Sequence, residues 1–392
     1  MATRTQTTSR TRTALAQSAD KNGTTEGRAG FSFESLAQAY FDCRHSKRNT
    51  PSALAFEANL ERNLIKLHDE LAAGTYVPGK SICFVVTKPK AREVWAADFR
   101  DRIVHHLLYN HIAPRFYASF IADSCACIPG RGTLYAARRL EAKIRSTSQN
   151  WSKPVYYLKM DLANFFVQID KSIVQTQLAK RIDEPFWMDL AKLILWHDPR
   201  QNYELRGAAQ LAALVPPHKR LTHQPAHLGL PIGNLSSQFF ANVYLDALDQ
   251  YAKHQLRARH YIRYVDDFII LHESAPWLND VLAKIDAWLP NNLGARLNHS
   301  KTILQPVTRG VDFVGHVIKP WHTTTRRRTV REAQARLRVA PDADFHTTAN
   351  SYFGLLRQSP ASHHDRALLA RLALRRGFAV DKQLTKTFRR AA

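Results

Sequence analysis

The chain has few cysteines and no long hydrophobic run. Four cysteines in 392 residues give no disulfide framework and no Cys-x-x-Cys pair with zinc-site spacing, which fits a reducing cytoplasm. No apolar stretch approaches the roughly 18 residues that a membrane-spanning helix needs, and the N-terminus lacks the hydrophobic core of a signal peptide. We therefore expect a cytoplasmic globular protein that is neither secreted nor inserted in a membrane.

Acidic residues are scarce relative to basic ones. The chain has 33 acidic residues against 56 lysines and arginines, a formal charge of +23 and an isoelectric point near 10.1. The basic residues are spread along the chain, as binding along a polyanion requires, so nucleic acid is the favoured partner. A basic protein with solvated charged faces is the alternative. A membrane surface is disfavoured, because no long basic amphipathic helix is present.

The pair Asp266-Asp267 lies between two apolar runs, within Arg263-Tyr-Val-Asp-Asp-Phe-Ile-Ile-Leu271. This pattern predicts a strand, a two-residue turn and a returning strand. Two adjacent carboxylates at a hairpin tip repel each other unless a cation lies between them, which favours magnesium. Aspartate is also a common turn residue, so an ordinary surface turn explains the pair equally well when it is considered alone.

A third acidic residue, Asp161, lies in an aromatic and β-branched run from Val155 to Phe166. The run predicts a buried strand that delivers the Asp161 carboxylate at its end. Phosphoryl transfer by two metal ions needs carboxylates from separate strands to hold cations about 3.5–4 Å apart. Asp161, Asp266 and Asp267 supply that minimum.

These segments resemble the palm of reverse transcriptases. The Asp161 strand is similar to the family's first catalytic motif, and Tyr264-Val-Asp-Asp267 is similar to the third. The segment Gly229–Leu245 resembles the second motif, with Ile232-Gly233 and Ser237-Gln238 where most members have Gln-Gly and Ser-Pro. This form is similar to that of diversity-generating retroelement reverse transcriptases, which are close to the group II intron and retron-like bacterial enzymes.

Further motifs follow in the family's order. Leu297–Thr302 resembles the fourth motif, and Gly310–His316 resembles the primer-grip hairpin at the boundary of palm and thumb. Phe84–Trp95 and Phe99–Leu107 resemble the fingers. The resemblance covers most of the chain, roughly residues 33–356.

The resemblance implies a catalytic centre with two Mg²⁺ ions, which Mn²⁺ can replace. Asp161 and Asp266 would bind both ions, Asp267 would assist or orient, and the backbone carbonyl of Leu162 would be a further metal ligand. Lys301 would protonate the pyrophosphate leaving group, although a surface turn residue is the alternative for this lysine.

The resemblance also implies a deoxynucleotide site. Phe166 would lie beneath the incoming sugar and exclude a 2′-hydroxyl, with core packing of this ring as the alternative. Ile232 stands where most relatives have a glutamine that contacts nucleotide and template, so a source of discrimination is lost and mispairing should rise. Gly233 and Gln238 would line the same site.

Basic residues would hold the triphosphate and the nucleic acid. Lys88, Lys90 and Arg92 lie on an expected fingers hairpin and would bind the triphosphate, Arg92 in a bidentate manner; a solvated strand face is the alternative. By resemblance, the primer and template would contact a further set of residues, Tyr264, Gly315, Arg326, Arg327 and Arg328.

We expect an α+β right-hand polymerase with four parts. These are a disordered basic tail at 1–30, fingers at 31–150, a palm at 151–318 and a helical thumb at 319–392. The thumb should ride on a duplex, because it has 15 basic and 5 acidic residues from Pro320 onward. Helical spacing is expected in several segments, with a long loop at 197–228: 35–73, 94–115, 134–146, 173–195, 235–254, 275–289, 330–339, 352–357 and 365–376.

The expected function is RNA-directed DNA synthesis in a bacterial or phage-encoded retroelement. The template would be a dedicated structured RNA, the products an RNA/DNA duplex made from dNTPs, and a small basic accessory protein oligomer would assist a diversity-generating system. A related enzyme in phage defence with a non-coding RNA template is one alternative, and a catalytically silent RNA-binding scaffold is another. Nothing after the palm is long enough for a ribonuclease H, endonuclease or integrase domain.

Overall fold

The computed structural model describes residues 30–389 except 46, 89 and 209. The chain divides into two compact units that interleave along the sequence. Unit 1 consists of Met1–Phe120, Ala163–Leu248 and Leu289–Arg296, and unit 2 of Ile121–Leu162, Asp249–Trp288 and Leu297–Ala392. The tail expected at 1–30 lies outside the described residues, apart from Gly30. The division into fingers, palm and thumb stays a prediction.

The helices at the start of unit 1 begin at identifiable signals. Three helices replace the single stretch expected at 35–73, namely α3 (Phe33–His45), α4 (Pro51–Glu57) and α5 (Leu60–Ala72). Proline at the first position of α4 fixes φ for a new helix and interrupts the preceding one. The next helix, α6 (Phe99–Tyr117), begins after Asp98, whose side chain accepts a hydrogen bond from the backbone N–H of Arg100. The helix expected from Val94 was therefore wrong at its start.

A three-stranded sheet in unit 1 has the order β2-β1-β4. Strands β1 (Ser81–Val86) and β2 (Arg92–Ala96) form the expected hairpin, with Val86 opposite Arg92. Strand β4 (Tyr203–Arg206) pairs with β1 in parallel. The expected loop at 197–228 thus contains a strand, and also the short helices α11 (Gln210–Ala213), η1 (Pro217–Lys219) and η2 (Leu221–His223).

The remaining helices of this part of the chain lie close to the expected ranges. The stretch expected at 173–195 is two helices, α9 (Lys171–Ala179) and α10 (Pro185–Trp196), because Pro185 starts a new one. Helix α12 (Leu235–Gln250) continues as a π-helical turn, η3 (Tyr251–Gln255), and α13 spans Ala275–Leu293.

The central sheet of unit 2 is antiparallel with the order β5-β6-β3-β7. Its strands are β3 (Tyr156–Asp161), β5 (His260–Tyr264), β6 (Asp267–His272) and β7 (Ile303–Pro306). Both faces of β6 are buried, because Phe268, Ile269, Ile270 and Leu271 are each at most 1% exposed. A strand buried on both faces explains the unbroken apolar run in the sequence.

One face of this sheet packs on helix α7 (Thr133–Thr147) and on a second sheet. The second sheet has the order β10-β9-β8, with β8 at Val311–Phe313, β9 at His316–Lys319 and β10 at His322–Thr325. Leu140 and Ile144 of α7 share a core with Ile269 of β6 and Phe313 of β8. The expected helix at 134–146 is confirmed.

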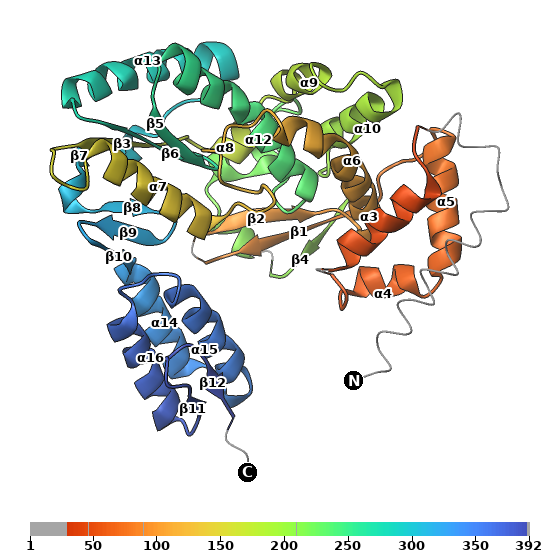
Figure 1. Ribbon diagram of the computed structural model, residues 1–392. Coiled ribbons are helices and arrows are strands. Elements are labelled where there is room, and N and C mark those ends of the chain that lie inside the picture. Colours follow the sequence, from red (N-terminus) through yellow and green to blue (C-terminus); the bar gives the residue numbers. More distant parts are fainter. Residues whose placement is uncertain (1–29, 46, 89, 209, 390–392) are drawn as a thin grey trace. The chain divides into compact units, whose positions relative to one another are not determined.

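The C-terminal part of unit 2 is a helical bundle with a core of its own (Figure 1). It consists of α14 (Arg327–Val339), α15 (Asp342–Leu356) and α16 (His363–Arg375), followed by β11 (Ala379–Val380) and β12 (Thr387–Phe388). Phe345, Phe353 and Leu369 are fully buried within it. The expected α+β class is confirmed. Over the described residues, every helix is too short or too polar to cross a lipid bilayer.

Candidate active site

The sheet of unit 2 brings together the three aspartates predicted from the sequence. Asp161 is the last residue of β3 and lies directly opposite Asp267, the first residue of β6. Asp266 belongs to the two-residue turn that joins β5 to β6, because Tyr264 pairs with Asp267. The turn residues are therefore Val265 and Asp266, and Asp267 belongs to the strand.

Burial and the repulsion of a neighbouring carboxylate raise the pKa of Asp266 and of Asp267. Burial raises the pKa of Asp266 to about 6, and the negative charge of Asp161 contributes to the rise. Burial also raises the pKa of Asp267, against the opposing charge of Lys159. A site in which carboxylates resist ionisation is one that a cation stabilises.

Two lysines face the aspartates. The Nζ of Lys301 forms an ion pair with Oδ1 of Asp161. The Nζ of Lys159 lies 3.7 Å from Oδ2 of Asp267 and donates a hydrogen bond to the carbonyl oxygen of Asp312 at 3.1 Å. Lys159 was missed in the sequence, although its position two residues before Asp161 places both side chains on one face of β3.

The end of β3 is fixed by the segment that carries Lys301. The backbone N–H of Asn298 donates to the carbonyl oxygen of Asp161 at 2.8 Å, and its side-chain Nδ2 lies 3.4 Å from Oδ1 of the same residue. The backbone N–H of Leu162 donates to the carbonyl oxygen of Asp266 at 3.3 Å. Asn298 is a second residue that sequence reasoning did not select.

The carboxylate oxygens of this site suit a hard divalent cation, but those of Asp161 and Asp267 are paired with lysines. Within the described ranges no group of three or more histidine, cysteine, aspartate or glutamate side chains is arranged as a ready metal cluster. Carboxylate oxygens are the ligands that Mg²⁺ prefers, and Asp161, Asp266 and Asp267 provide them from two adjacent strand ends. The residues present therefore fit magnesium, provided that an ion replaces Lys301 on Asp161.

The hairpin of β1 and β2 in unit 1 carries the basic residues predicted to bind the triphosphate. Arg92 opens β2, and Lys88 and Lys90 lie in the turn between β1 and β2. All three side chains are exposed. The hairpin is confirmed, and the role of these residues stays a prediction.

The loop before α12 is attached to the backbone of β2. The N–H of Trp95 donates to the carbonyl oxygen of Ile232 at 2.7 Å, and the N–H of Ala97 donates to Oδ1 of Asn234 at 3.0 Å. Gly233 has φ +133°, and a β-carbon there would lie 2.8 Å from the carbonyl oxygen of Trp95. Only glycine fits this position, which explains the Gly233 of the motif. Gln238 is exposed on the first turn of α12.

Phe166 lies on a short helix, not on a strand. Helix α8 (Phe165–Gln168) follows Asn164, whose φ of +48° ends the strand direction. The strand predicted over the run from Val155 to Phe166 therefore ends earlier, at Asp161. Phe165 is nevertheless the core residue at 5% exposed, whereas Phe166 is half-buried and its carbonyl oxygen accepts a hydrogen bond from the N–H of Leu230 at 2.8 Å.

The predicted primer-side residues all lie in unit 2. Gly315, with φ +90°, is in the turn between β8 and β9, and its carbonyl oxygen accepts from the N–H of Arg326 at 2.9 Å. The Nε of Arg326 donates to Oδ1 of Asp312 at 2.8 Å. Arg327 and Arg328 are exposed at the start of α14, and Tyr264 is half-buried at the end of β5.

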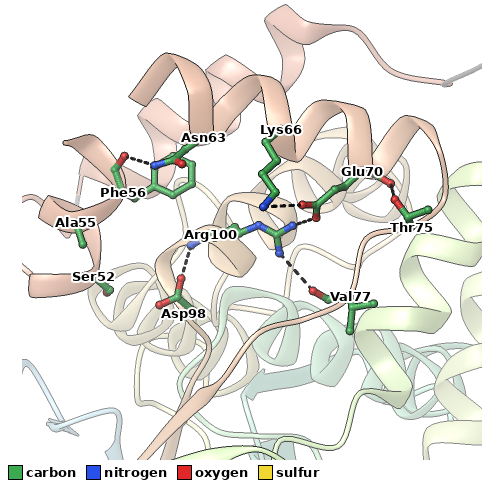
Figure 2. Close-up of a pocket in the computed structure, with 10 residues that line it drawn as sticks. All are labelled: Ser52, Ala55, Phe56, Asn63, Lys66, Glu70, Thr75, Val77, Asp98 and Arg100. Atoms are coloured by element: carbon green, nitrogen blue, oxygen red, sulfur yellow. Dashed lines mark hydrogen bonds and ion pairs between the residues drawn. The ribbon is translucent and has the colours of Figure 1, made fainter. Parts of the chain in front are cut away.

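A surface cavity of about 620 Å³ in unit 1 lies apart from these residues in the sequence and shares none of them. Figure 2 shows Arg100 within it, between α5 and Val77. The guanidinium of Arg100 pairs with Glu70 and donates to the carbonyl oxygen of Val77 at 3.3 Å, and Lys66 lies 4.0 Å from Glu70. Its charges are paired with one another, so the cavity presents no net charge to a ligand.

Comparisons with known proteins point to one family. The family model described as reverse transcriptase (RNA-dependent DNA polymerase) matches residues 86–318. Protein YkfC of Escherichia coli (strain K12) is 22% identical over 294 residues, which are 66% of this chain and 72% of YkfC. The putative COX1/OXI3 intron 2 protein of Saccharomyces cerevisiae is 22% identical over 223 residues, which are 42% of this chain and 24% of that protein.

Solved structures of telomerase are also similar to this chain. The telomerase from Candida albicans in complex with a TWJ fragment of telomeric RNA is 14% identical, with a TM-score of 0.44, over 76% of this chain and 54% of that one. The equivalent complex from Candida tropicalis is 12% identical, with a TM-score of 0.48, over 77% and 54%. This chain thus spans about half the length of these telomerases. Because the family match covers more than half of its residues, the chain belongs to the reverse transcriptase (RNA-dependent DNA polymerase) family.

Proposed function

We propose that this chain synthesises cDNA on an RNA template by two-metal-ion nucleotidyl transfer. The observation that carries the proposal is the meeting of Asp161, Asp266 and Asp267 at two adjacent strand ends, where the pKa of Asp266 is raised to about 6 by burial and by Asp161. When bound, two Mg²⁺ ions would supply the charge that activates a primer hydroxyl and stabilises the leaving oxygen. The three carboxylates and the carbonyl of Leu162 would hold them.

The lysines of the site take distinct roles in this proposal. Lys301 pairs with Asp161 in the metal-free protein, and once a metal ion takes its place its ammonium group would be free to give a proton to the pyrophosphate leaving group. Lys159 holds the carboxylate of Asp267 from the same face of β3. Removal of the Lys301 ammonium should therefore lower the rate of the chemical step more than the affinity for nucleotide.

The proposal assigns the nucleotide contacts and the nucleic-acid contacts to two sets of residues. Arg92, with Lys88 and Lys90, would bind the triphosphate of a dNTP. Phe166 would exclude ribonucleotides, so Phe166→Ala should admit them into the product. Template RNA and the RNA/DNA duplex would contact a set comprising Tyr264, Gly315, Arg326, Arg327 and Arg328.

We further propose that synthesis is error-prone, as in a bacterial or phage diversity-generating retroelement with a dedicated structured RNA and a small basic accessory protein oligomer. The supporting observation is Ile232. Its carbonyl oxygen is held by Trp95, and its side chain offers only apolar contact where a polar partner would discriminate between base pairs.

Sequencing of the cDNA tests both proposals. Primer extension on RNA should require Mg²⁺ or Mn²⁺, and Ile232→Gln should lower the misincorporation rate by about tenfold. Ile65→Gln, on the exposed face of α5 where Ile65 is 47% exposed, is the matched control. An unchanged error spectrum in Ile232→Gln removes the explanation for infidelity. A defined or repetitive product would instead indicate a defence enzyme, and no extension at all would indicate a silent scaffold.

A further inference from the structure

The turn that carries Asp266 has a backbone conformation that its sequence does not favour. Val265 has φ +55°, whereas Asp266 is not among the residues with positive φ. A positive φ at only the first of two turn residues is the pattern of a type II′ hairpin, in which that position is normally glycine. A β-branched residue there is strained, and the surrounding structure must offset that strain.

One side chain holds the strained residue directly. The Nη1 of Arg263 donates a hydrogen bond to the carbonyl oxygen of Val265 at 3.1 Å. Arg263 belongs to β5 and is the third residue before Asp266, so this hydrogen bond connects the strand before the turn to the turn itself. The carbonyl oxygen of Asp266 is held separately by the N–H of Leu162, which links the turn to the end of β3.

The guanidinium of Arg263 is itself fixed by buried partners. Nε and Nη2 donate to the two carboxylate oxygens of Asp249 at 2.7 Å each, and the two side chains are 1% and 0% exposed. Nη2 also lies 2.9 Å from Oγ of Ser124. The hydroxyl of Tyr261 donates to Oδ1 of Asp249 at 2.6 Å. A bidentate pair of this kind has one defined geometry.

The backbone of Arg263 is held as firmly as its side chain. Its N–H donates to the carbonyl oxygen of Asp123 at 2.9 Å, and its carbonyl oxygen accepts from the N–H of Cys125 at 3.0 Å. Asp123 is anchored by Lys143 at 3.0 Å and Lys253 at 2.7 Å. Arg263 is therefore a fixed point from which the turn can be positioned.

We propose that Arg263 is a positioning residue whose buried pair with Asp249 holds Val265 in its strained conformation and so sets the place of the Asp266 carboxylate. A buried ion pair contributes little to stability relative to apolar residues of the same volume, so stability alone does not account for it. This inference rests on the proposed polymerase function, because the position of Asp266 matters through catalysis. A misplacement of a reacting group by about 1 Å costs on the order of 10²-fold in rate.

Single-turnover nucleotide incorporation by Arg263→Lys tests the proposal. Lysine keeps the charge but cannot hold Asp249 in a bidentate manner and reach Val265 at once. We expect the maximal rate to fall by about 10–100-fold, with the dissociation constant for nucleotide changed by less than about twofold. Tyr261→Phe is the control, since it removes one hydrogen bond to Asp249 and leaves the contact between Arg263 and Val265 in place.

The decisive variant adds Val265→Gly to Arg263→Lys. Glycine adopts a positive φ without strain, so the double variant should regain at least about tenfold of the lost rate. A rate loss that Val265→Gly does not restore, or an Arg263→Lys variant with a wild-type rate, overturns the proposal. If Arg263→Lys does not fold, Ser124→Ala takes its place, with a loss of about threefold expected that disappears in the Val265→Gly background; additive effects would contradict the proposal.

Hydrogen exchange separates failure of this proposal from failure of the proposed function. In metal-free protein, amide exchange at Val265, Asp266 and Asp267 should be faster in Arg263→Lys than in wild type and unchanged in Tyr261→Phe. This readout needs no polymerase activity. Equal exchange in Arg263→Lys and wild type overturns the positioning role even if the enzyme is active, whereas an inactive wild type with the expected exchange pattern overturns only the polymerase assignment.

Discussion

The strand ends of unit 2 that carry the three aspartates and the hairpin-and-loop region of unit 1 are held in different ways. In unit 2 the functional groups are charges in contact with charges: Asp161 with Lys301, Asp267 with Lys159, and Arg263 with Asp249. In unit 1 the loop at Ile232 and Gly233 is held by backbone hydrogen bonds and by close approach to Trp95. The contrast indicates that ion pairs fix the strand ends that carry the aspartates, the proposed site of chemistry, and that close backbone packing fixes the loop at Gly233, the proposed site of nucleotide selection.

The largest loss of activity is expected from Asp266→Asn, which tests the part of this comparison that concerns charge. Extension should fall by at least about a thousandfold, because the change removes a carboxylate that is proposed to bind the metal ions. The same change should stabilise the metal-free protein by about 1–2 kcal/mol at pH 7, since it removes a buried carboxylate with a raised pKa.

Primer extension and thermal denaturation measure the two effects of Asp266→Asn. Asp280→Asn is the matched control, because Asp280 is 55% exposed and pairs only at the surface with Lys284. If primer extension by Asp266→Asn stays within tenfold of wild type, the charge of Asp266 is not needed for catalysis and its proposed role is wrong.

Gly233→Ala should affect selection in unit 1. The added β-carbon would lie 2.8 Å from the carbonyl oxygen of Trp95 at a φ of +133°, so the loop must move away from β2. We expect the KM for nucleotide to rise by about 10–30-fold and stability to fall by about 1–3 kcal/mol. Gly132→Ala, where a β-carbon has open space, is the control for steady-state kinetics. An unchanged KM would show that the close approach is not what shapes the site.

The pH dependence of primer extension should arise from Asp266 in unit 2. With the pKa of Asp266 raised to about 6, protons compete with the metal ion at a pH where an ordinary aspartate is ionised. The Mg²⁺ concentration for half-maximal extension should rise by about tenfold from pH 7 to pH 5.

The sign of the effect on stability is opposite to that of a salt-bridged acid. The folded protein binds this proton more tightly than the unfolded chain, so Asp266 becomes increasingly unfavourable in the metal-free protein as the pH rises from about 4 to about 6. Metal titrations at pH 5, 6 and 7 check the prediction, and a requirement independent of pH would contradict it.

The smallest effect is expected from Glu93→Gln. The Glu93 side chain is buried and accepts hydrogen bonds from Nε1 of Trp95 at 3.2 Å and from the N–H of Leu221 at 2.9 Å. Both bonds end on the same oxygen, Oε2, so a glutamine can keep them through its carbonyl oxygen, but without the negative charge they weaken and β2 beside Arg92 should loosen slightly. We expect a rise of about threefold in the KM for nucleotide with kcat nearly unchanged. Glu204→Gln, on the exposed strand β4, is the control, and an equal effect of both variants would show that burial of Glu93 is not the cause.

The strands of the proposed catalytic site could be predicted because each is specified by the residues of its own short segment. The apolar run before Asp161 and the runs on either side of Asp266 specify strands by themselves, and the structure places them side by side. Lys159 and Asn298 were missed, because their contacts depend on the pairing of β3 with β6 and on the return of the chain near Asp161.

The errors have equally local causes. Val94 was assigned to a helix because the capping role of Asp98 was overlooked, and the helix begins only after that residue. Phe166 was placed on a strand because an aromatic pair suits both strand and helix, whereas the left-handed turn at Asn164 decides for a helix. Strand β4 gave no signal, because all four of its residues are exposed and its partner β1 lies more than a hundred residues away.

Strand β4 also limits how the hairpin of β1 and β2 can move. Since β1 lies between β2 and β4, and the N–H of Ser81 donates to the carbonyl oxygen of Asn202 at 3.0 Å, the hairpin cannot move on its own. It can move only together with the segment that carries β4 or by breaking the parallel pairing of β1 with β4. If this hairpin binds the triphosphate as proposed, the strength of that pairing would set how readily its basic residues can approach a nucleotide.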